Sequence, residues 1–285
     1  MDAEIAYEGN ESGREFEIEL RLLAEAIYQK YHYDFRSYAP ASLRRRMKVA
    51  MRRFGCSTLS RLQERMMHEP AVFPALLDYL TVQVSEMFRD PPYFRAIREQ
   101  VVPLLRTYPS LKIWVAGCSG GEEAYSLAIL LREEGLLSKS LIYATDINPR
   151  TLHSAAAGVF DADRVPGFTM NHHKSGGHSS LSDYYTAAYG RAVFNKSLKD
   201  HIVFSDHSLA TDSVFAEVQM VSCRNVLIYF NRALQDRALG LFKDSLCRQG
   251  FLGIGTKETI RFSACAADFN ELMHDERIYQ RKASL

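Results

Sequence analysis

The chain has 285 residues, of which 47% are hydrophobic and 24% are charged, and its formal net charge is +1. This composition is typical of a folded globular protein and excludes a largely disordered one. No run approaches the roughly 18 apolar residues that a membrane-spanning helix needs. Four acidic residues among the first eleven argue against a secretory signal, which would open with basic residues. The sequence therefore predicts a cytoplasmic protein.

The five cysteines are widely spaced and include no CxxC pair, which argues against a disulfide framework or a structural zinc site and favours a reduced compartment. His172, His173 and His178 lie near two glycines, but their spacing does not match the known patterns of metal ligands. We therefore expect a polar loop at these histidines and no metal site.

Apolar residues recur at helical spacing from Phe16 to about Val84. Prolines and glycines interrupt the pattern where helices should break. These residues predict an N-terminal domain, 16–84, made of three or four short helices. The apolar positions that define its helical faces are Phe16, Leu20, Leu23, Ile27, Leu43, Met47, Ala50, Phe54, Phe73, Leu76, Leu77 and Leu80.

The second expected helix is strongly basic, because residues 36–65 contain nine lysines and arginines and only one acidic residue, Glu64. A solvated helix face is the ordinary explanation for a run of charges. A face of one sign repels itself unless an acidic partner lies against it, so a binding surface is the alternative. That partner could be an acidic protein or a nucleic acid. No aromatic residues interleave the basic ones, as a single-strand platform would require.

After Pro91 and Pro92, short β-rich runs alternate with helical stretches, which predicts a parallel sheet with crossover helices. Residues 85–285 are therefore expected to form an α/β domain. Residues 158–200 interrupt the alternation, and we expect an inserted antiparallel subdomain with a mobile tip. The predicted strands are 111–116, 141–145, 202–205, 218–222 and 251–254, and the predicted helices are 122–134 and 232–247.

The most informative stretch is a strand followed by a glycine-rich turn, Gly117 to Gly121, and a helix. Ligands of doubly wound folds lie at such turns, where glycine lets the backbone approach them closely. The turn reads GxxGG rather than GxGxxG, and Glu122 and Glu123 would repel a pyrophosphate at the helix N-terminus. A cofactor with an amino group and a sulfonium suits these acids, which favours S-adenosylmethionine over NAD. A role in capping the helix is a plausible alternative for Glu122 and a weaker one for the pair.

Polar residues also follow the next strands. Asp146 ends the second strand, 25 residues after Gly121, where an acidic side chain can bind both ribose hydroxyls of a nucleoside. Arg224 and Asn225 follow a later strand, and there they would need loop carbonyls or the cofactor as partners. Tyr229 lies a few residues further on, where its ring lines a methyl-transfer pocket or simply packs in the core.

In these residues the chain resembles the CheR-type chemoreceptor glutamate methyltransferases of bacterial chemosensory systems. The resemblance extends from about Phe16 to Leu285. It implies a small all-α domain followed by a Rossmann-like, S-adenosylmethionine-dependent methyltransferase domain with an inserted β subdomain. The motifs that carry it are Ser85-Glu-Met-Phe-Arg-Asp90, Gly120-Gly-Glu-Glu-Ala-Tyr-Ser126, Ala144-Thr-Asp-Ile147 and Cys223-Arg-Asn-Val-Leu-Ile-Tyr-Phe230.

The resemblance also implies roles for individual residues. Tyr229 is the catalytic candidate, next to the transferred methyl. Gln83, Ser85 and Ser208 replace an Asn, a Thr and an Asn of the family, so we expect cofactor binding with altered affinity. Gly255-Thr-Lys-Glu258 likewise departs from the commoner Gly-x-Ser-Glu. Together with Gly117 of the turn, the expected cofactor-binding residues are Gln83, Ser85 and Arg89 at the methionine end, Glu123, Asp146 at the ribose, Ser208 and Leu209 near the adenine, and Arg224 and Asn225.

The implied reaction transfers a methyl group from S-adenosylmethionine to a receptor glutamate and leaves S-adenosylhomocysteine. A glutamate carboxylate has a reference pKa of about 4.3, so it is already an ionised nucleophile and needs no general base. The implied partner is the cytoplasmic domain of a methyl-accepting chemoreceptor, through which a monomeric enzyme meets the membrane only indirectly. The basic residues expected to hold its acidic helices are Arg44, Arg45, Arg46, Arg52 and Arg53.

Three alternatives remain open at this point. The chain could bind S-adenosylmethionine as a regulatory or docking protein without catalysis. It could methylate nucleic acid, although residues 224–227 lack the Asn-Pro-Pro-Tyr type of element that base methyltransferases carry there. An NAD-dependent oxidoreductase is disfavoured by the acidic residues after the glycine turn.

Overall fold

The computed structural model describes residues 13–283, so the acidic residues that argue against a secretory signal lie outside the described part. The chain divides into two compact units. The helical unit contains the residues up to Val82 together with Tyr229–Leu234, and the sheet unit contains Gln83–Ile228 and the residues from Gln235 onward. No helix within residues 13–283 has both the length and the apolarity that crossing a membrane requires.

The helical unit is built from the amphipathic helices that the sequence predicted. Leu20, Leu23 and Ile27 are buried along one face of the first helix, as the spacing indicates. Pro40 opens the second helix, and Gly55 ends it in the left-handed conformation with φ 64°. The Thr58 hydroxyl caps the third helix by accepting a hydrogen bond from the Arg61 amide. The helices are α1 (Gly13–Tyr31), α2 (Pro40–Phe54), α3 (Leu59–His68) and α4 (Val72–Leu80).

A distant stretch of sequence, Tyr229–Leu234, packs within the helical unit. The Ala39 amide donates to the Tyr229 carbonyl at 2.8 Å, and the Asn231 amide donates to the Ser37 carbonyl at 2.9 Å. These bonds satisfy backbone groups just before α2. Residues near the start of the chain therefore form part of the surroundings of Tyr229, the tyrosine of the Cys223–Phe230 motif.

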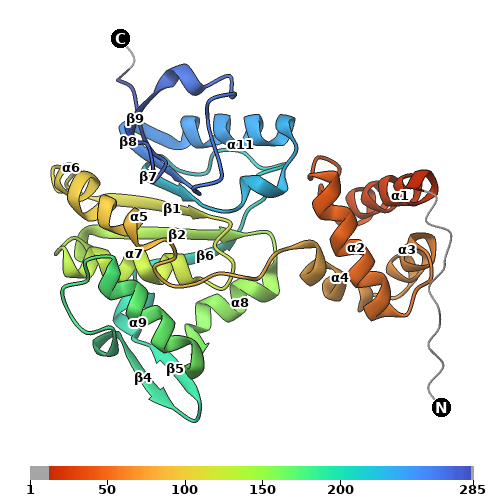
Figure 1. Cartoon of the computed structure of the whole chain (residues 1–285), viewed down its shortest axis with the longest axis horizontal. Helices are drawn as coiled ribbons and strands as arrows, with labels where there is room; N and C mark the ends of the chain where they lie inside the picture. The colour runs from red at the N-terminus through yellow and green to blue at the C-terminus, as the bar shows by residue number, and fades with distance from the viewer. Residues whose placement is uncertain (1–12, 284–285) are drawn as a thin grey trace. The chain divides into compact units, whose positions relative to one another are not determined.

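The sheet unit contains a seven-stranded sheet in the order β6-β2-β1-β7-β8-β10-β9 (Figure 1). The five strands that the sequence predicted pair in parallel. Two further strands near the C-terminus add an antiparallel edge that the sequence analysis missed. The strands are β1 (Leu111–Ala116), β2 (Ser140–Asp146), β6 (Ile202–Asp206), β7 (Val218–Cys223), β8 (Leu246–Ile254), β9 (Phe269–Met273) and β10 (Ile278–Arg281).

Helix α7 (Glu122–Glu133) is the most deeply buried helix next to this sheet, and nine of its twelve residues are buried. A helix that is apolar on nearly all sides belongs in a core. The other helical elements are α5 (Pro91–Ala96), the π-helical turn η1 (Ile97–Val101), α6 (Val102–Leu105), η2 (Leu137–Lys139), α8 (Pro149–Ala157), η5 (Leu227–Tyr229), α11 (Arg232–Ser245) and η6 (Ala266–Asp268).

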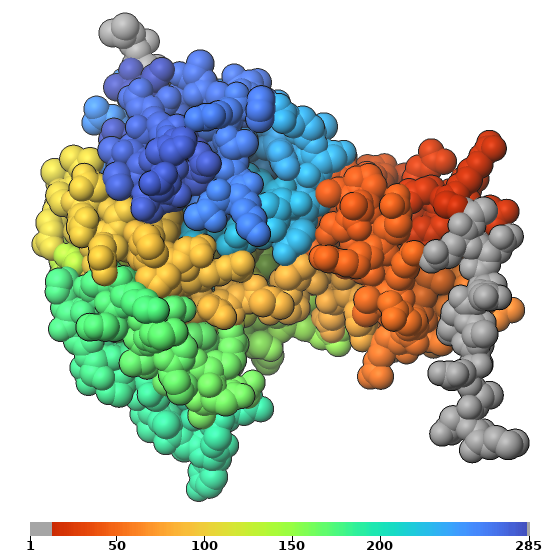
Figure 2. All heavy atoms as spheres, in the orientation of Figure 1, coloured from red at the N-terminus to blue at the C-terminus, as the bar shows by residue number. Residues whose placement is uncertain are grey.

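The insertion contains the small antiparallel sheet that the sequence predicted, in the order β3-β5-β4. Figure 2 shows the surface of the insertion (green to teal) as a projecting lobe. The expected polar loop is wrong in part, because His172 and His173 lie on a helix and His172 is only 2% exposed. Its elements are β3 (Val159–Asp161), η3 (Ala162–Arg164), α9 (Val165–Lys174), η4 (Leu181–Tyr184), β4 (Tyr185–Ala188), β5 (Arg191–Phe194) and α10 (Lys196–Lys199).

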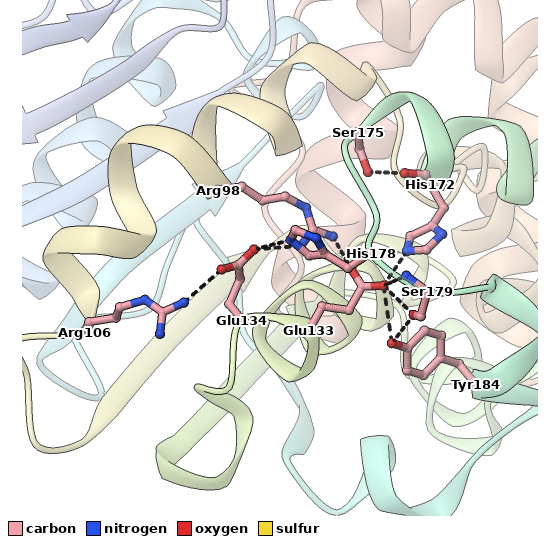
Figure 3. A network of polar contacts seen from close by, with 9 residues as sticks. All are labelled: Arg98, Arg106, Glu133, Glu134, His172, Ser175, His178, Ser179 and Tyr184. Atoms are coloured by element: carbon pink, nitrogen blue, oxygen red, sulfur yellow. Dashed lines mark hydrogen bonds and ion pairs between the residues drawn. The ribbon is translucent and has the colours of Figure 1, made fainter.

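A buried polar network fastens the insertion to α7 (Figure 3). The Glu133 carboxylate bonds to His172 Nε2 at 2.9 Å and accepts hydrogen bonds from the hydroxyls of Ser179 and Tyr184 at 2.7 and 3.3 Å. Arg98, from the π-helical turn, pairs with both Glu133 and Glu134. Glu134 also contacts the side chains of Arg106 and His178, each at 3.0 Å.

The network keeps Glu133 ionised. Burial alone raises the pKa of its carboxyl, but hydrogen bonds from His172 and Ser179 and the charge of Arg98 outweigh burial and lower the pKa to about 2. Desolvating a carboxylate costs several kcal/mol unless charges and hydrogen bonds compensate it fully. The position of α9 is therefore tied to a buried charge that must stay paired.

We predict that Glu133→Gln lowers the free energy of unfolding by about 3 kcal/mol at pH 7, because each pKa unit corresponds to about 1.4 kcal/mol. The folded-state pKa lies below the ordinary value of 4.5. The stabilisation is therefore fully present above pH 4.5 and is lost as the pH falls toward 2. Urea unfolding should show that the gap between wild type and variant narrows by about 2 kcal/mol between pH 7 and pH 3.

Asp161→Asn is the matched control, because the ion pair of Asp161 with Arg191 in the same insertion is exposed. Exposed pairs contribute about 0–1 kcal/mol, so this variant should unfold almost as wild type does at both pH values. A Glu133→Gln gap that did not change with pH would contradict the assignment of an ionised, paired Glu133.

Candidate cofactor site

Four parallel strands end at one edge of the sheet and bring the predicted polar residues together there. The strand register aligns Ala116 with Thr145 and Asp146 with Asp206. In open α/β sheets ligands bind at the carboxyl ends of the strands. The predicted residues at this edge, which follow or end β1, β2, β6 and β7, are Gly117, Asp146, Ser208, Leu209, Arg224 and Asn225.

The glycine turn after β1 requires glycine for steric reasons. Gly117 and Gly121 have φ values of 72° and 87°, in the left-handed region. A β-carbon on Gly117 would lie 2.5 Å from a methyl of Val226, and one on Gly120 would lie 2.8 Å from the Glu122 carboxylate. The backbone of the turn is thus packed closely against the loop after β7.

Asp146 is fixed by two backbone amides. Its carboxylate accepts one hydrogen bond from the Ser119 amide at 3.0 Å and one from the Asn148 amide at 3.1 Å. Burial raises its pKa, and these two bonds oppose the rise. A carboxylate oxygen has two lone pairs, so each oxygen can accept a further hydrogen bond. The geometry thus suits an acceptor for the ribose hydroxyls that the sequence assigned to Asp146.

Arg224 connects three parts of the site. Its guanidinium pairs with Glu123 of α7 at 3.1 Å and with Asp90 at 2.6 Å, and it lies 4.0 Å from the centre of the Tyr93 ring. Glu123 also accepts a hydrogen bond from the Ser222 hydroxyl at 2.6 Å. The alternatives for Arg224 were loop carbonyls or the cofactor, whereas its strongest contacts are with two carboxylates. Sequence reasoning missed Tyr93 and Ser222 and named Asp90 only as the end of a motif, because no local pattern links these residues to Arg224.

Glu122 does not act as a simple helix cap. Its buried carboxylate pairs at 2.9 Å with Arg164 of the insertion. Because Glu123 pairs with Arg224, each acid of the turn has an arginine partner, and Arg224 is shared with Asp90. Glu122 Oε2 and Ser119 Oγ are buried without a hydrogen-bond partner among residues 13–283. Buried polar atoms need partners, so these two atoms fit a ligand with amino and hydroxyl groups.

The Ser85–Asp90 segment lies in the same unit. The Gln83 side-chain oxygen accepts a hydrogen bond from the Thr151 hydroxyl at 2.7 Å, and the Phe88 amide donates to the Ser126 hydroxyl at 2.8 Å. Phe88 and Asp90 have φ values of 51° and 57°, a backbone strain that often marks functional sites. Arg89 is half-buried in this segment.

Ser208 and Leu209 follow β6 after one intervening residue. The preceding residue, His207, donates its amide to the Asp146 carbonyl at 3.3 Å. The Ser208 amide donates to the Asp212 carboxylate at 2.8 Å, which shapes the loop beside Asp146. The pair assigned to the adenine is therefore adjacent in space to the residue assigned to the ribose.

Glu258 is a structural member of the site that sequence reasoning noted only as part of a variant motif. Its carboxylate accepts hydrogen bonds from the amides of Asn225, Ile228 and Gly255 at 3.1, 3.2 and 2.5 Å. Burial raises its pKa, and the amide bonds oppose that rise. Asn225 has a φ of 60°, so the loop after β7 is held in a strained conformation by one acidic side chain.

Comparison with known proteins agrees with this geometry. Residues 18–81 match the model of the CheR methyltransferase all-alpha domain, and residues 83–274 match the model of the CheR methyltransferase SAM binding domain. The chain belongs to the CheR methyltransferase family. It is an S-adenosylmethionine-dependent methyltransferase, with the all-α and Rossmann-like parts that the sequence predicted.

Relatives span most of the chain. A protein named "Putative methyltransferase Cher3" from Pseudomonas putida is 57% identical over 95% of this chain and 99% of its own length. A "Chemotaxis protein methyltransferase" from Listeria innocua is 28% identical over 80% of this chain and 84% of its own length. A "Chemotaxis protein methyltransferase 1" from Vibrio cholerae is 28% identical over 65% of this chain and 68% of its own length.

Tyr229, the catalytic candidate of this CheR-family chain, belongs to the helical unit, where the guanidinium of Arg46 lies 4.4 Å from its ring centre. Arg46 also donates to the Leu80 carbonyl and is only 8% exposed. Burial lowers its pKa. The expectation that Arg46 is part of an exposed partner surface is therefore wrong. The other four arginines of that set, Arg44, Arg45, Arg52 and Arg53, are exposed.

We predict that Glu258→Gln weakens binding of S-adenosylhomocysteine and lowers the free energy of unfolding by about 1–3 kcal/mol. In the variant, the side-chain NH2 of the new glutamine would face a backbone N–H that in the wild type donates to a carboxylate oxygen. The loop that carries Asn225 would therefore move. Calorimetric titration and urea unfolding measure the two effects. Asp275→Asn, an exposed substitution between β9 and β10, is the control and should change neither. Unaltered binding by Glu258→Gln would separate this loop from the cofactor.

Proposed function

We propose that this chain is a protein-glutamate O-methyltransferase that methylates glutamate side chains of chemoreceptors in the cytoplasm and so serves adaptation in chemosensory signalling. The observation that carries the proposal is the match of both parts of the chain to one family, whose members from Listeria and Vibrio bear the name chemotaxis protein methyltransferase. The fixed carboxylate of Asp146 beside a glycine turn supports a nucleoside cofactor there.

The proposed arrangement of the cofactor follows the strand ends. Asp146 binds the ribose, and Ser208 and Leu209 lie at the adenine. The turn at Gly117 lets the backbone approach the cofactor closely. Gln83, Ser85 and Arg89 are proposed to lie toward the methionine end, and the remaining proposed contacts are Glu123, Arg224 and Asn225.

The proposed mechanism asks the chain to orient and desolvate the reactants rather than to move protons. S-adenosylmethionine supplies an activated methyl group. The acceptor glutamate has a reference pKa of about 4.3, so it arrives ionised and no residue of this chain needs to deprotonate it. Alignment of reacting groups is worth about 7–11 kcal/mol in favourable cases, and exclusion of water strengthens the attack of a carboxylate. Tyr229 is proposed to orient the reacting groups.

The proposed docking surface is the exposed basic face of α2. Arg45, Arg52 and Arg53 occupy positions i, i+7 and i+8, which lie on the same side of a helix. Arg44 is partly neutralised, because its Nε donates to Glu17 of α1 at 2.6 Å. A partner surface rich in glutamates would complement the three remaining arginines and be steered toward them.

Incubation with radiolabelled S-adenosylmethionine and receptor-containing membranes tests the function directly. We expect label in the receptor band that alkali releases as methanol, since methyl esters are alkali-labile. Calorimetric binding of the cofactor without any transfer would instead indicate a docking or regulatory protein. Label transferred to DNA or RNA and not to the receptor would indicate a nucleic-acid methyltransferase.

We predict that Tyr229→Phe lowers the rate of methyl transfer by about 10–100-fold, the range that misorientation of reacting groups can cause. The phenylalanine ring keeps the face against which Arg46 packs, so the fold should be unaffected. Steady-state kinetics and calorimetry together check this, because affinity for S-adenosylhomocysteine should remain close to wild type. Unchanged turnover would remove the hydroxyl from the mechanism.

We predict that Arg52→Glu combined with Arg53→Glu raises the receptor KM at least tenfold, since like charges then face the acidic partner. Cofactor affinity should not change. The matched control is Arg14→Glu combined with Arg21→Glu, which makes the same change in charge on the exposed face of α1. An equal rise in KM for both pairs would indicate net charge rather than a docking face.

A further inference from the structure

The insertion touches the Ser85–Asp90 segment at three points. Arg164 donates to the Ser85 carbonyl, and the Asn171 side-chain amide donates to the Met87 carbonyl at 3.2 Å. The His172 ring lies 4.9 Å, centre to centre, from the Phe88 ring. Because Phe88 has a positive φ, this backbone needs support from outside the segment.

Arg164 is the member of this set that also reaches the glycine turn. Its guanidinium pairs with Glu122, in the first turn of α7, at 2.9 Å. The Phe168 ring lies 4.9 Å from the guanidinium carbon and limits its orientation. One arginine of the insertion therefore joins the Ser85 carbonyl to the start of α7.

We propose that Arg164 is a positioning residue for methyl transfer, which sets the Ser85–Asp90 segment against the first turn of α7. The inference rests on the proposed function, in which this segment and that turn flank the cofactor. Arg164 acts through Ser85 and Glu122.

Arg164 should couple the first turn of α7 strongly to the Ser85–Asp90 segment. The Glu122 side chain is only 3% exposed, and removal of the partner of a buried charge leaves that charge uncompensated. Hydrogen bonds between charged groups are about twice as strong as neutral ones. Loss of Arg164 therefore disturbs both the turn and the segment, and a misplacement of about 1 Å near reacting groups can reduce a rate about 100-fold.

Through Arg164, a movement of the insertion would also affect the proposed cofactor site. Arg164 is the last residue of η3, the short turn that follows β3, and β3 pairs with β5 in the antiparallel sheet. A shift of that sheet would move Arg164, and with it the carbonyl of Ser85. Any ligand that displaced the insertion would thus alter cofactor affinity without touching the cofactor.

The test compares Arg164→Gln with Arg164→Lys, and with Arg191→Gln as matched control. Arg191 lies in the same insertion and pairs with exposed Asp161. We expect Arg164→Gln to raise the Kd for S-adenosylhomocysteine about tenfold and to lower kcat by a similar factor, with the receptor KM unchanged. Arg164→Lys, which keeps the charge next to Glu122, should recover part of both losses. Arg191→Gln should behave as wild type.

Measurements are made well below the thermal unfolding midpoint of each variant, so that a general loss of stability does not alter Kd or kcat. If Arg164→Gln does not fold, Arg164→Lys carries the test, since a lysine keeps the charge next to Glu122 but loses the guanidinium fork that also reaches the Ser85 carbonyl. Wild-type Kd and kcat in whichever variant folds would overturn the proposal, as would a fall in the unfolding midpoint alone.

Asp146→Ala separates this inference from the proposed cofactor site. Loss of cofactor binding in Asp146→Ala together with wild-type behaviour of Arg164→Gln would overturn the positioning role and leave the site standing. Wild-type binding by Asp146→Ala would overturn the proposed placement of the cofactor, and with it the reason to expect an effect of Arg164.

Discussion

The sheet unit depends on three acidic side chains of α7, two of them buried and one half-buried, and each of them pairs with an arginine from another part of the chain. Glu122 pairs with Arg164 of the insertion, Glu123 pairs with Arg224 after β7, and Glu133 pairs with Arg98 of the π-helical turn. Desolvation of a carboxylate is tolerated only where pairing is nearly complete. The three ion pairs therefore fix the positions of three segments relative to one helix, in a way that apolar packing alone would not specify.

This arrangement explains how the glycine turn can be surrounded by acids and remain stable. Glu122 and Glu123 each pair with an arginine of the protein, and Arg224 is shared between Glu123 and Asp90, so the choice of cofactor cannot rest on the charge of these two acids alone. What remains for a ligand is a set of oriented acceptors, above all the Asp146 carboxylate held by two amides. The electrostatic argument from the sequence led to the right cofactor, and the structure adds a carboxylate that backbone amides hold in place at the strand ends.

Local patterns predicted the parallel strands, the glycine turn and the helical faces, because burial imposes a period on each of them. Pairings between distant residues leave no such trace. Nothing around Arg164 or Glu258 indicates that one reaches Glu122 and the other holds the loop at Asn225. Helix α9 was missed because its polar histidines resemble a loop, although His172 is buried by its bond to Glu133. Arg46 was predicted to lie on the partner surface with its exposed neighbours, because a run of basic residues does not indicate which of them is buried.

The insertion is an integral part of the methyltransferase rather than an appendage to it. His172 contacts Glu133 at the end of α7 and the ring of Phe88 in the Ser85–Asp90 segment, so one buried imidazole touches both the polar network and that segment. Arg164 makes a second connection at the start of the same helix. With both ends of α7 tied to the insertion, the small sheet cannot move as a rigid body without disturbing one of these contacts. A projecting subdomain built in this way is mechanically linked to the edge of the sheet where the strands end.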